Sequence, residues 1–277
     1  MSTLEAILLG LVQGLTEFLP VSSSGHLRIL PAMYGGEDPG AAFTAIVQLG
    51  TMAAELVFFR FDIARIARAT WRSIITRRVG GDIDARLGWF ILIGTVPISL
   101  FGLALADSIE TGARDLTLIG STLILFGLVL FAAEKVGKRT RPLERIRTRD
   151  GLIMGFAQAL ALVPGVSRSG ATISAGLFLG LDRVAAARFS FLLSIPAVVL
   201  SGGLQLFSLL LGEGDASGAD PGWAAIAVAT VLAFVAGYAT IAFLLRYLAT
   251  HSVNVFVVYR LALGTLVLVL VGTGAIA

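Results

Sequence analysis

The sequence contains no cysteine, only two histidines among its 277 residues, and few charged side chains. Without cysteine, the chain has no disulfide framework, thiol nucleophile or thiolate metal site. Charged residues make up 14% of the chain, against about 25% in soluble domains, whereas hydrophobic residues make up 56% and the mean hydropathy is +0.89. So few charges cannot cover a water-facing surface, which excludes a cytosolic enzyme, a secreted disulfide scaffold and a disordered chain. We therefore expect an all-α polytopic membrane protein.

The charges that are present separate by sign along the chain. Seven of the 21 Lys and Arg residues lie within 60–86 and seven more within 134–150. The stretches 34–40, 107–115 and 212–221 are mainly acidic. Because short basic loops stay in the cytoplasm, we expect the two basic segments to be cytoplasmic loops that contact anionic lipid, and the acidic segments to lie outside. The net charge of +3 therefore does not indicate a nucleic-acid partner.

Apolar stretches of two kinds alternate with these segments. Six are long enough to span a bilayer as full transmembrane helices: 41–59, 87–106, 116–133, 189–211, 222–245 and 253–276. The other two, 4–33 and 151–181, are each interrupted in the middle by Pro, Gly and Ser. The alternation of sides would make both of these begin and end on one side, so we predict two re-entrant helical hairpins, with ordinary proline-kinked spans as the alternative. The N-terminal stretch is not expected to be a cleaved signal peptide, because it lacks a basic segment.

The two interrupted stretches are related by a shift of 145 residues. Over 10–25 against 155–170, seven of 16 columns are identical without a gap. Three predicted spans follow each stretch, so we expect one membrane domain made of two inverted repeats, 1–134 and 150–277. In transporters, such repeats place their irregular turns near the bilayer midplane. Non-helical backbone at that depth is tolerated only inside protein or beside water, so the turns are predicted to mark the functional site.

The two repeats differ at two columns where a reaction would need different side chains. Glu17 stands opposite Leu162, and Ser23 stands opposite Arg168. Together with His26, just past the first turn, these residues bring a carboxylate, hydroxyls, a guanidinium and an imidazole to one place. We therefore predict Glu17, Ser23, His26 and Arg168 as catalytic residues, with a hydrogen-bonded polar residue as the alternative for His26.

Each turn also leads into a predicted helix start. A serine cap leaves free N–H groups and the positive end of the helix dipole, and two converging starts with an arginine make a phosphate cradle. The predicted phosphate-binding residues are Ser22, Ser24, Gly25, Ser167, Ser169, Gly170 and Thr172.

Gln13 lies four residues before Glu17, so the two side chains share one helix face. A carboxylate and an amide oxygen suit a hard cation, and we predict that both bind Mg²⁺ or Ca²⁺; Glu17 is alternatively a general base. Among the other ionisable residues in or beside the spans, Glu55, Arg246 and Arg260 are explained by snorkelling or internal pairing. Arg260 is the strongest exception.

The motifs from Gln13 to His26 and from Pro164 to Thr172 resemble the two signatures of the BacA-type undecaprenyl-diphosphate phosphatases. The resemblance covers essentially the whole chain and implies removal of one phosphate from undecaprenyl diphosphate at the outer face of the bacterial inner membrane. This reaction recycles the lipid carrier for wall synthesis, is linked to bacitracin resistance, and depends on a divalent cation. The family's Glu, Ser, His and Arg map onto Glu17, Ser23, His26 and Arg168.

Several alternatives stay open at this point. A lipid flippase or transporter is the second hypothesis for function, because inverted repeats often mean alternating access. For the nucleophile, Ser23 is favoured over His26 and over a metal-activated water. The expected partners are the polyprenyl substrate and membrane lipid, with a homodimer left open and no nucleic acid.

Overall fold

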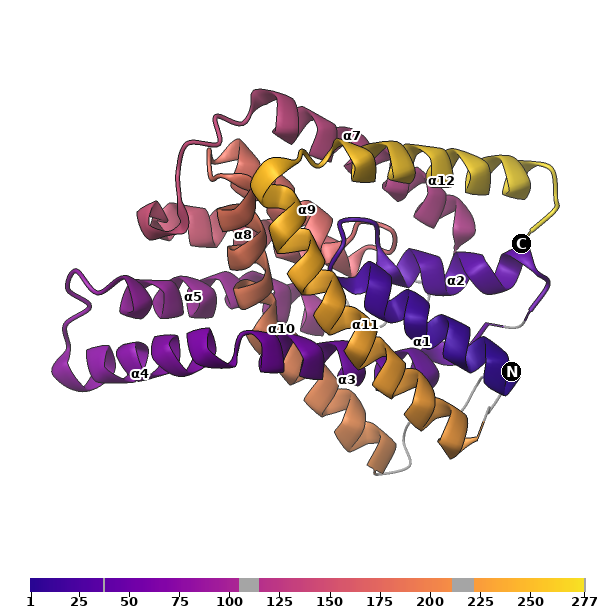
Figure 1. The fold of residues 1–277 in the computed structure, drawn as a ribbon, viewed down its shortest axis with the longest axis horizontal. Helices are drawn as coiled ribbons and strands as arrows, with labels where there is room; N and C mark the ends of the chain where they lie inside the picture. The colour runs from indigo at the N-terminus through magenta and orange to yellow at the C-terminus, as the bar shows by residue number, and fades with distance from the viewer. Residues whose placement is uncertain (37, 105–114, 211–221, 277) are drawn as a thin grey trace.

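The computed structural model describes residues 1–36, 38–104, 115–210 and 222–276. Every regular element in these ranges is helical, apart from one isolated bridge between Arg141 and Leu181. In chain order the elements are α1 (Thr3–Glu17), α2 (Ser23–Met33), α3 (Gly40–Phe58), α4 (Arg60–Thr76), α5 (Ile83–Ala104), α7 (Leu116–Val136), η1 (Leu143–Arg145), α8 (Thr148–Ala159), η2 (Leu160–Leu162), α9 (Arg168–Phe178), α10 (Arg183–Leu210), α11 (Trp223–Thr250) and α12 (Asn254–Gly272) (Figure 1). Most of the acidic stretches predicted at 107–115 and 212–221 lies outside the described residues.

Among the described residues, five helices are long and apolar enough to cross a membrane, namely α5, α7, the part of α10 from Arg183 to Gly203, α11 and α12. Helix α3 meets the same test only together with α4, from which it is bent by 71°. The protein is therefore a multi-pass membrane protein, whose described part is all-helical and holds five or six candidate spans.

Helix α4 corrects one expectation from the sequence. The segment 60–86 was predicted to be a loop because of its arginines, but residues 60–76 form a helix that packs along α5. The physical reason is an amphipathic pattern: Ile66, Ala69, Thr70 and Ser73 recur at helical spacing and are buried, while the arginines occupy the other face.

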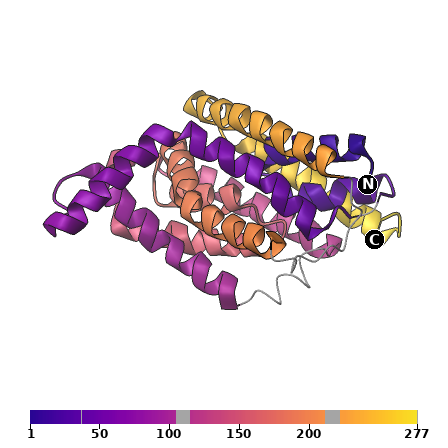
Figure 2. The same cartoon turned by 90° about the horizontal axis from the view of Figure 1, so that it is seen from below.

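The connection between α4 and α5 lies at one end of the molecule, and both chain termini lie at the other end (Figures 1 and 2). The basic and terminal parts of the chain are thus separated along the long axis. Between them, α7 and α12 lie side by side, and α11 crosses over α1.

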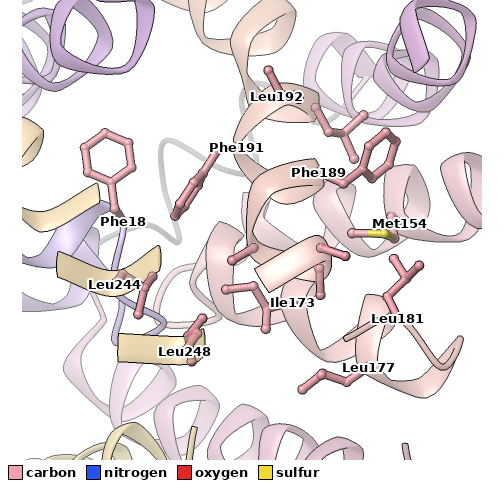
Figure 3. Packing of buried hydrophobic residues seen from close by; sticks show 14 of the residues in the cluster. Phe18, Met154, Ile173, Leu177, Leu181, Phe189, Phe191, Leu192, Leu244 and Leu248 are labelled. Atoms are coloured by element: carbon pink, nitrogen blue, oxygen red, sulfur yellow. The ribbon is translucent and has the colours of Figure 1, made fainter. Parts of the chain in front are cut away.

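The interior is packed around α10, with Phe18 and Phe191 in edge-to-face contact and Met154 close to Phe189 in the same cluster (Figure 3). This cluster joins the end of α1 to α8, α9 and α10. Phe18 and Val21 of the first turn are part of it.

Each short helix that precedes a turn packs on a long helix from the other half of the chain. Gly10 of α1 faces the backbone of Ala229 in α11, and Gly155 of α8 faces the backbone of Gly94 in α5. A side chain at either glycine would collide with that backbone, and small residues allow such close helix contact. Gly10 and Gly155 are equivalent positions in the predicted repeat.

Candidate active site

The two turns end in the same unusual backbone conformation. Ser22 has φ 73° and Ser167 has φ 70°, a region that non-glycine residues adopt at a cost of about 1–3 kcal/mol. Each serine caps the next helix, because the Ser22 Oγ accepts from the Gly25 N–H at 3.4 Å and the Ser167 Oγ accepts from the Gly170 N–H at 3.1 Å. Helix α2 therefore starts at Ser23 and α9 starts at Arg168.

The first residues of these two helices meet at the carboxylate of Glu17. The Ser23 hydroxyl donates to Glu17 Oε2 at 2.5 Å, and Arg168 Nη2 donates to Glu17 Oε1. The Gln13 amide also donates to Oε2, at 3.0 Å. The structure thus brings together four of the residues that the sequence singled out, from both turns, on one carboxylate.

This cluster is charged but nearly enclosed. The side chains of Glu17 and Arg168 are only 8% and 18% exposed. Enclosed charges of this kind persist when they are paired and hydrogen-bonded, and in a membrane protein they usually serve a function. The carboxylate is placed to take the proton of Ser23, while the guanidinium has further N–H donors for an oxyanion.

His26 takes part in a separate pair of hydrogen bonds. Its Nδ1 lies 2.7 Å from the Ser22 carbonyl oxygen and its Nε2 lies 2.6 Å from the Tyr259 hydroxyl. Because a carbonyl can only accept, Nδ1 carries a proton, and when the ring is neutral Nε2 accepts from Tyr259. The two rings are nearly parallel, with an interplanar angle of 4° and centroids 5.6 Å apart. Of the two candidates for a base at Ser23, Glu17 therefore makes the contact and His26 does not.

The predicted phosphate-binding hydroxyls differ in availability. Ser24 is exposed, with its hydroxyl 3.3 Å from that of Ser22. In contrast, the Ser169 hydroxyl donates to the Leu19 carbonyl at 2.9 Å and so joins the two turns. Thr172 is fully buried and bonds to Ser190 and to its own helix. Ser169 and Thr172 are thus engaged within the protein.

The whole chain is similar to known proteins. The sequence model of the family described as bacitracin resistance protein BacA matches residues 6–266. The chain belongs to the BacA family. An undecaprenyl-diphosphatase of Nocardioides sp. is 55% identical over 99% of this chain and 98% of its own length. Those of Kineococcus radiotolerans and Mycolicibacterium smegmatis are 55% and 53% identical, over 100% of this chain and 96% and 99% of their own lengths.

Two residues of this BacA-family site were not proposed from the sequence. Tyr259 contacts His26, and nothing in its local pattern indicates this except its position beside the intramembrane Arg260. Glu55 of α3 is 2% exposed and accepts from the Ser194 hydroxyl at 2.7 Å. It interacts electrostatically with Arg168 and Glu17. The sequence signal for Glu55 was an ionisable residue within an apolar stretch.

An apolar cavity of about 250 Å³ lies elsewhere, between α4, α5 and α10. Leu192 and Ile195 line it, whereas Ser190 and Ser194 of the same helix bond to Thr172 and Glu55. At about 100° per residue, these two pairs occupy opposite sides of α10. The cavity is therefore separated from the BacA-family site by that helix.

Proposed function

We propose that this chain hydrolyses undecaprenyl diphosphate to undecaprenyl phosphate and inorganic phosphate. The reaction takes place at the outer face of the bacterial inner membrane and returns the lipid carrier to wall synthesis. The observation that carries the proposal is the Glu17 carboxylate, which accepts from Ser23 and Arg168 at the starts of two helices. Membership of a family whose relatives are named undecaprenyl-diphosphatase supplies the substrate class.

In the first step, Ser23 Oγ attacks the terminal phosphorus and its proton passes to Glu17 Oε2. The bond between that phosphorus and the bridging oxygen breaks, so the lipid monophosphate leaves while the phosphoryl group stays on Ser23. Arg168 stabilises the charge on the transferring oxygens. The 2.5 Å contact of Ser23 with Glu17 supports this assignment, because a serine hydroxyl is a poor nucleophile without a base.

In the second step, a water oxygen forms the new bond to phosphorus and the bond to Ser23 Oγ breaks. Oγ takes back the proton held by Glu17, and the surplus proton of the water goes to solvent. His26 is assigned to proton transfer or positioning and not to nucleophilic attack, because both of its ring nitrogens are already engaged, by Ser22 and Tyr259. A direct attack by water remains the competing route.

A divalent cation, Mg²⁺ or Ca²⁺, fits the donor atoms at this site. Within the described ranges, no group of three or more His, Cys, Asp or Glu side chains is placed to hold a metal. Glu17 and Ser23 offer oxygen atoms, and Gln13, whose amide nitrogen donates to Glu17, also has an amide oxygen. A hard cation that keeps waters and shares phosphate oxygens needs few protein ligands. Glu17 and Gln13 would hold it, and when bound it would neutralise charge on the diphosphate.

We also infer that the chain is built from two inverted repeats with six spans and two re-entrant hairpins. Three observations support this arrangement: the matching caps at Ser22 and Ser167, the equivalent starts of α2 and α9, and the packing of α1 and α8 on α11 and α5. The same arrangement favours lipid flipping as a second function. Transfer of a non-hydrolysable analogue across vesicles would test that function separately.

Sidedness can be measured on single cysteines, since the chain has none of its own. Gly81 is exposed and a side chain there would meet no neighbour, and Ala275 is exposed near the C-terminus. In intact cells an impermeant maleimide should label Ala275→Cys and leave Gly81→Cys unlabelled. The reverse pattern would overturn the orientation.

The activity is tested by phosphate release from purified protein, with and without chelator. Chelation should abolish turnover, and added Mg²⁺ or Ca²⁺ should restore it; full turnover in excess chelator would exclude the cation. Substrate labelled in its terminal phosphate should leave acid-stable label on Ser23 in quenched reactions. Acid-labile, base-stable label would instead assign His26, and absence of label throughout the time course would assign water.

A further inference from the structure

Arg260 is a cation in the middle of an apolar helix, and it is fully buried. All the hydrogen-bond partners recorded for it in the described part of the chain are main-chain carbonyl oxygens. They are Pro20 at 3.2 Å, Gly165 at 3.0 Å, Val166 at 3.1 Å, Leu123 at 3.2 Å and Thr122 at 3.4 Å. One guanidinium therefore joins both turns to α7.

Three of these acceptors are turn carbonyls that need a partner. Pro20, Gly165 and Val166 lie outside the α-helices, so their carbonyls are not part of a helical hydrogen-bond ladder, whereas Thr122 and Leu123 belong to α7. In an enclosed membrane site an unpaired carbonyl would be strongly unfavourable, because no water is there to bond it. Arginine meets the requirement because its planar group carries five N–H donors that reach acceptors in several directions. The single ammonium of lysine cannot reach as many acceptors so far apart.

Other contacts continue the same arrangement. The Thr122 hydroxyl donates to the Pro164 carbonyl at 2.6 Å, and the Ser169 hydroxyl donates to the Leu19 carbonyl. Hydrogen bonds from Arg260, Thr122 and Ser169 thus hold carbonyls of both turns. The residues that begin the following helices, Ser23 and Arg168, meet instead at Glu17.

We propose that Arg260 is a positioning residue for the phosphatase reaction, which holds the two turns in one register so that Ser23 and Arg168 meet at Glu17. The inference rests on the proposed roles of those three residues. Arg260 does not touch Glu17 or Ser23, so it acts through the turn backbone.

The first measurement compares turnover in Arg260→Lys, Arg260→Ala and a matched control, Arg246→Lys. Arg246 is exposed near the end of α11. Because a misplacement of about 1 Å can cost roughly 100-fold in rate, kcat should fall by about that factor in both Arg260 variants and stay unchanged in the control. Thermal unfolding in detergent measures the folded fraction, so kcat is expressed per folded molecule.

The second measurement reports on the turns themselves and requires no turnover. Spin labels on cysteines at Ser24 and Val163, both exposed, give the distribution of distances between the two turns. The distribution should be narrow with Arg260 and broader or displaced in Arg260→Lys. If Arg260→Ala does not fold, both measurements are made on Arg260→Lys alone.

Wild-type kcat per folded molecule together with an unchanged distance distribution in Arg260→Lys would overturn the proposal. A lowered unfolding temperature with normal kcat would also overturn it, because it would make Arg260 a stability residue only. Arg168→Lys in the same assay separates this failure from that of the proposed mechanism. If Arg168→Lys keeps its rate, the site assignment is wrong whatever Arg260 does.

Discussion

The turns at 18–22 and 163–167 can be compared atom by atom. In each, a serine with positive φ caps the next helix through a glycine N–H three residues on, and its hydroxyl lies 3.2–3.3 Å from that of the serine two residues on. The polar side chains that differ are those at the carboxylate. Glu17 is replaced by Leu162, and the serine at the first helical position is replaced by Arg168.

The two glutamines show the consequence of this difference. Gln13 bonds to Glu17, whereas its counterpart Gln158 is fully buried and neither polar atom of its amide has a partner in the described ranges. The glutamine at this repeat position therefore has a hydrogen-bond partner in the first half and none in the second, because position 162 has no carboxylate. Backbone symmetry thus builds the turns, and a few asymmetric side chains make one reaction centre.

The largest effect is expected for Glu17→Gln, which removes the carboxylate that distinguishes the first turn from the second. The amide cannot take the Ser23 proton or pair with Arg168, so phosphate release should fall on the order of 10³-fold. Glu144→Gln, at an exposed position, should match wild type. Substantial activity in folded Glu17→Gln would remove this carboxylate from the mechanism.

Arg168→Lys should follow, with a fall of roughly 100-fold in kcat. Lysine keeps the charge and loses the planar fork, so the comparison isolates geometry from charge. The measurement is steady-state kinetics on undecaprenyl diphosphate. A variant that kept most of its rate would show that the first helical position of α9 needs only a positive charge.

The glutamine pair gives a matched test of the two halves. Gln13→Leu should lower kcat about tenfold, since it removes a hydrogen bond to the Glu17 carboxylate. Gln158→Leu should leave kcat unchanged and raise the unfolding temperature, because a buried amide without a partner costs about 1–3 kcal/mol. Equal losses in the two variants would contradict the asymmetry.

The smallest effect is expected for Tyr259→Phe, which removes a single hydrogen bond to His26. A loss of about 1 kcal/mol corresponds to roughly a fivefold fall in kcat. The chain has only two histidines, so ¹⁵N spectra of labelled protein, assigned with His251→Gln, report on the ring directly. The Nε2 signal should move in Tyr259→Phe while Nδ1 stays protonated; an unchanged Nε2 signal would contradict the hydrogen bond.

Much of the fold and of the site could be predicted before the structure. Hydropathy located the long helices to within about six residues at each end, since about 20 apolar residues are needed to cross a bilayer. The internal repeat pointed to Glu17, Ser23 and Arg168, which do lie together. The helix at 60–76 was missed because charge density in that segment outweighed its amphipathic spacing.

The contacts across the molecule could not be derived in the same way. Nothing in the motif at 164–172 shows that the Ser169 hydroxyl bonds to the Leu19 carbonyl or that the Thr172 hydroxyl bonds to Ser190. Tyr259 reaches His26 over a separation of 233 residues, and such a pair leaves no local pattern.

By itself, the sequence determined the class of protein, the position of the turns and the residue types available there, because these follow from composition, periodicity and a repeat along the chain. Only the tertiary structure decided which groups are paired: Glu17 with Ser23 and Arg168, His26 with Tyr259, and Arg260 with the carbonyls of both turns. The physical reason is that a buried polar group needs a partner, and the packing of helices far apart in the sequence selects which partner it finds.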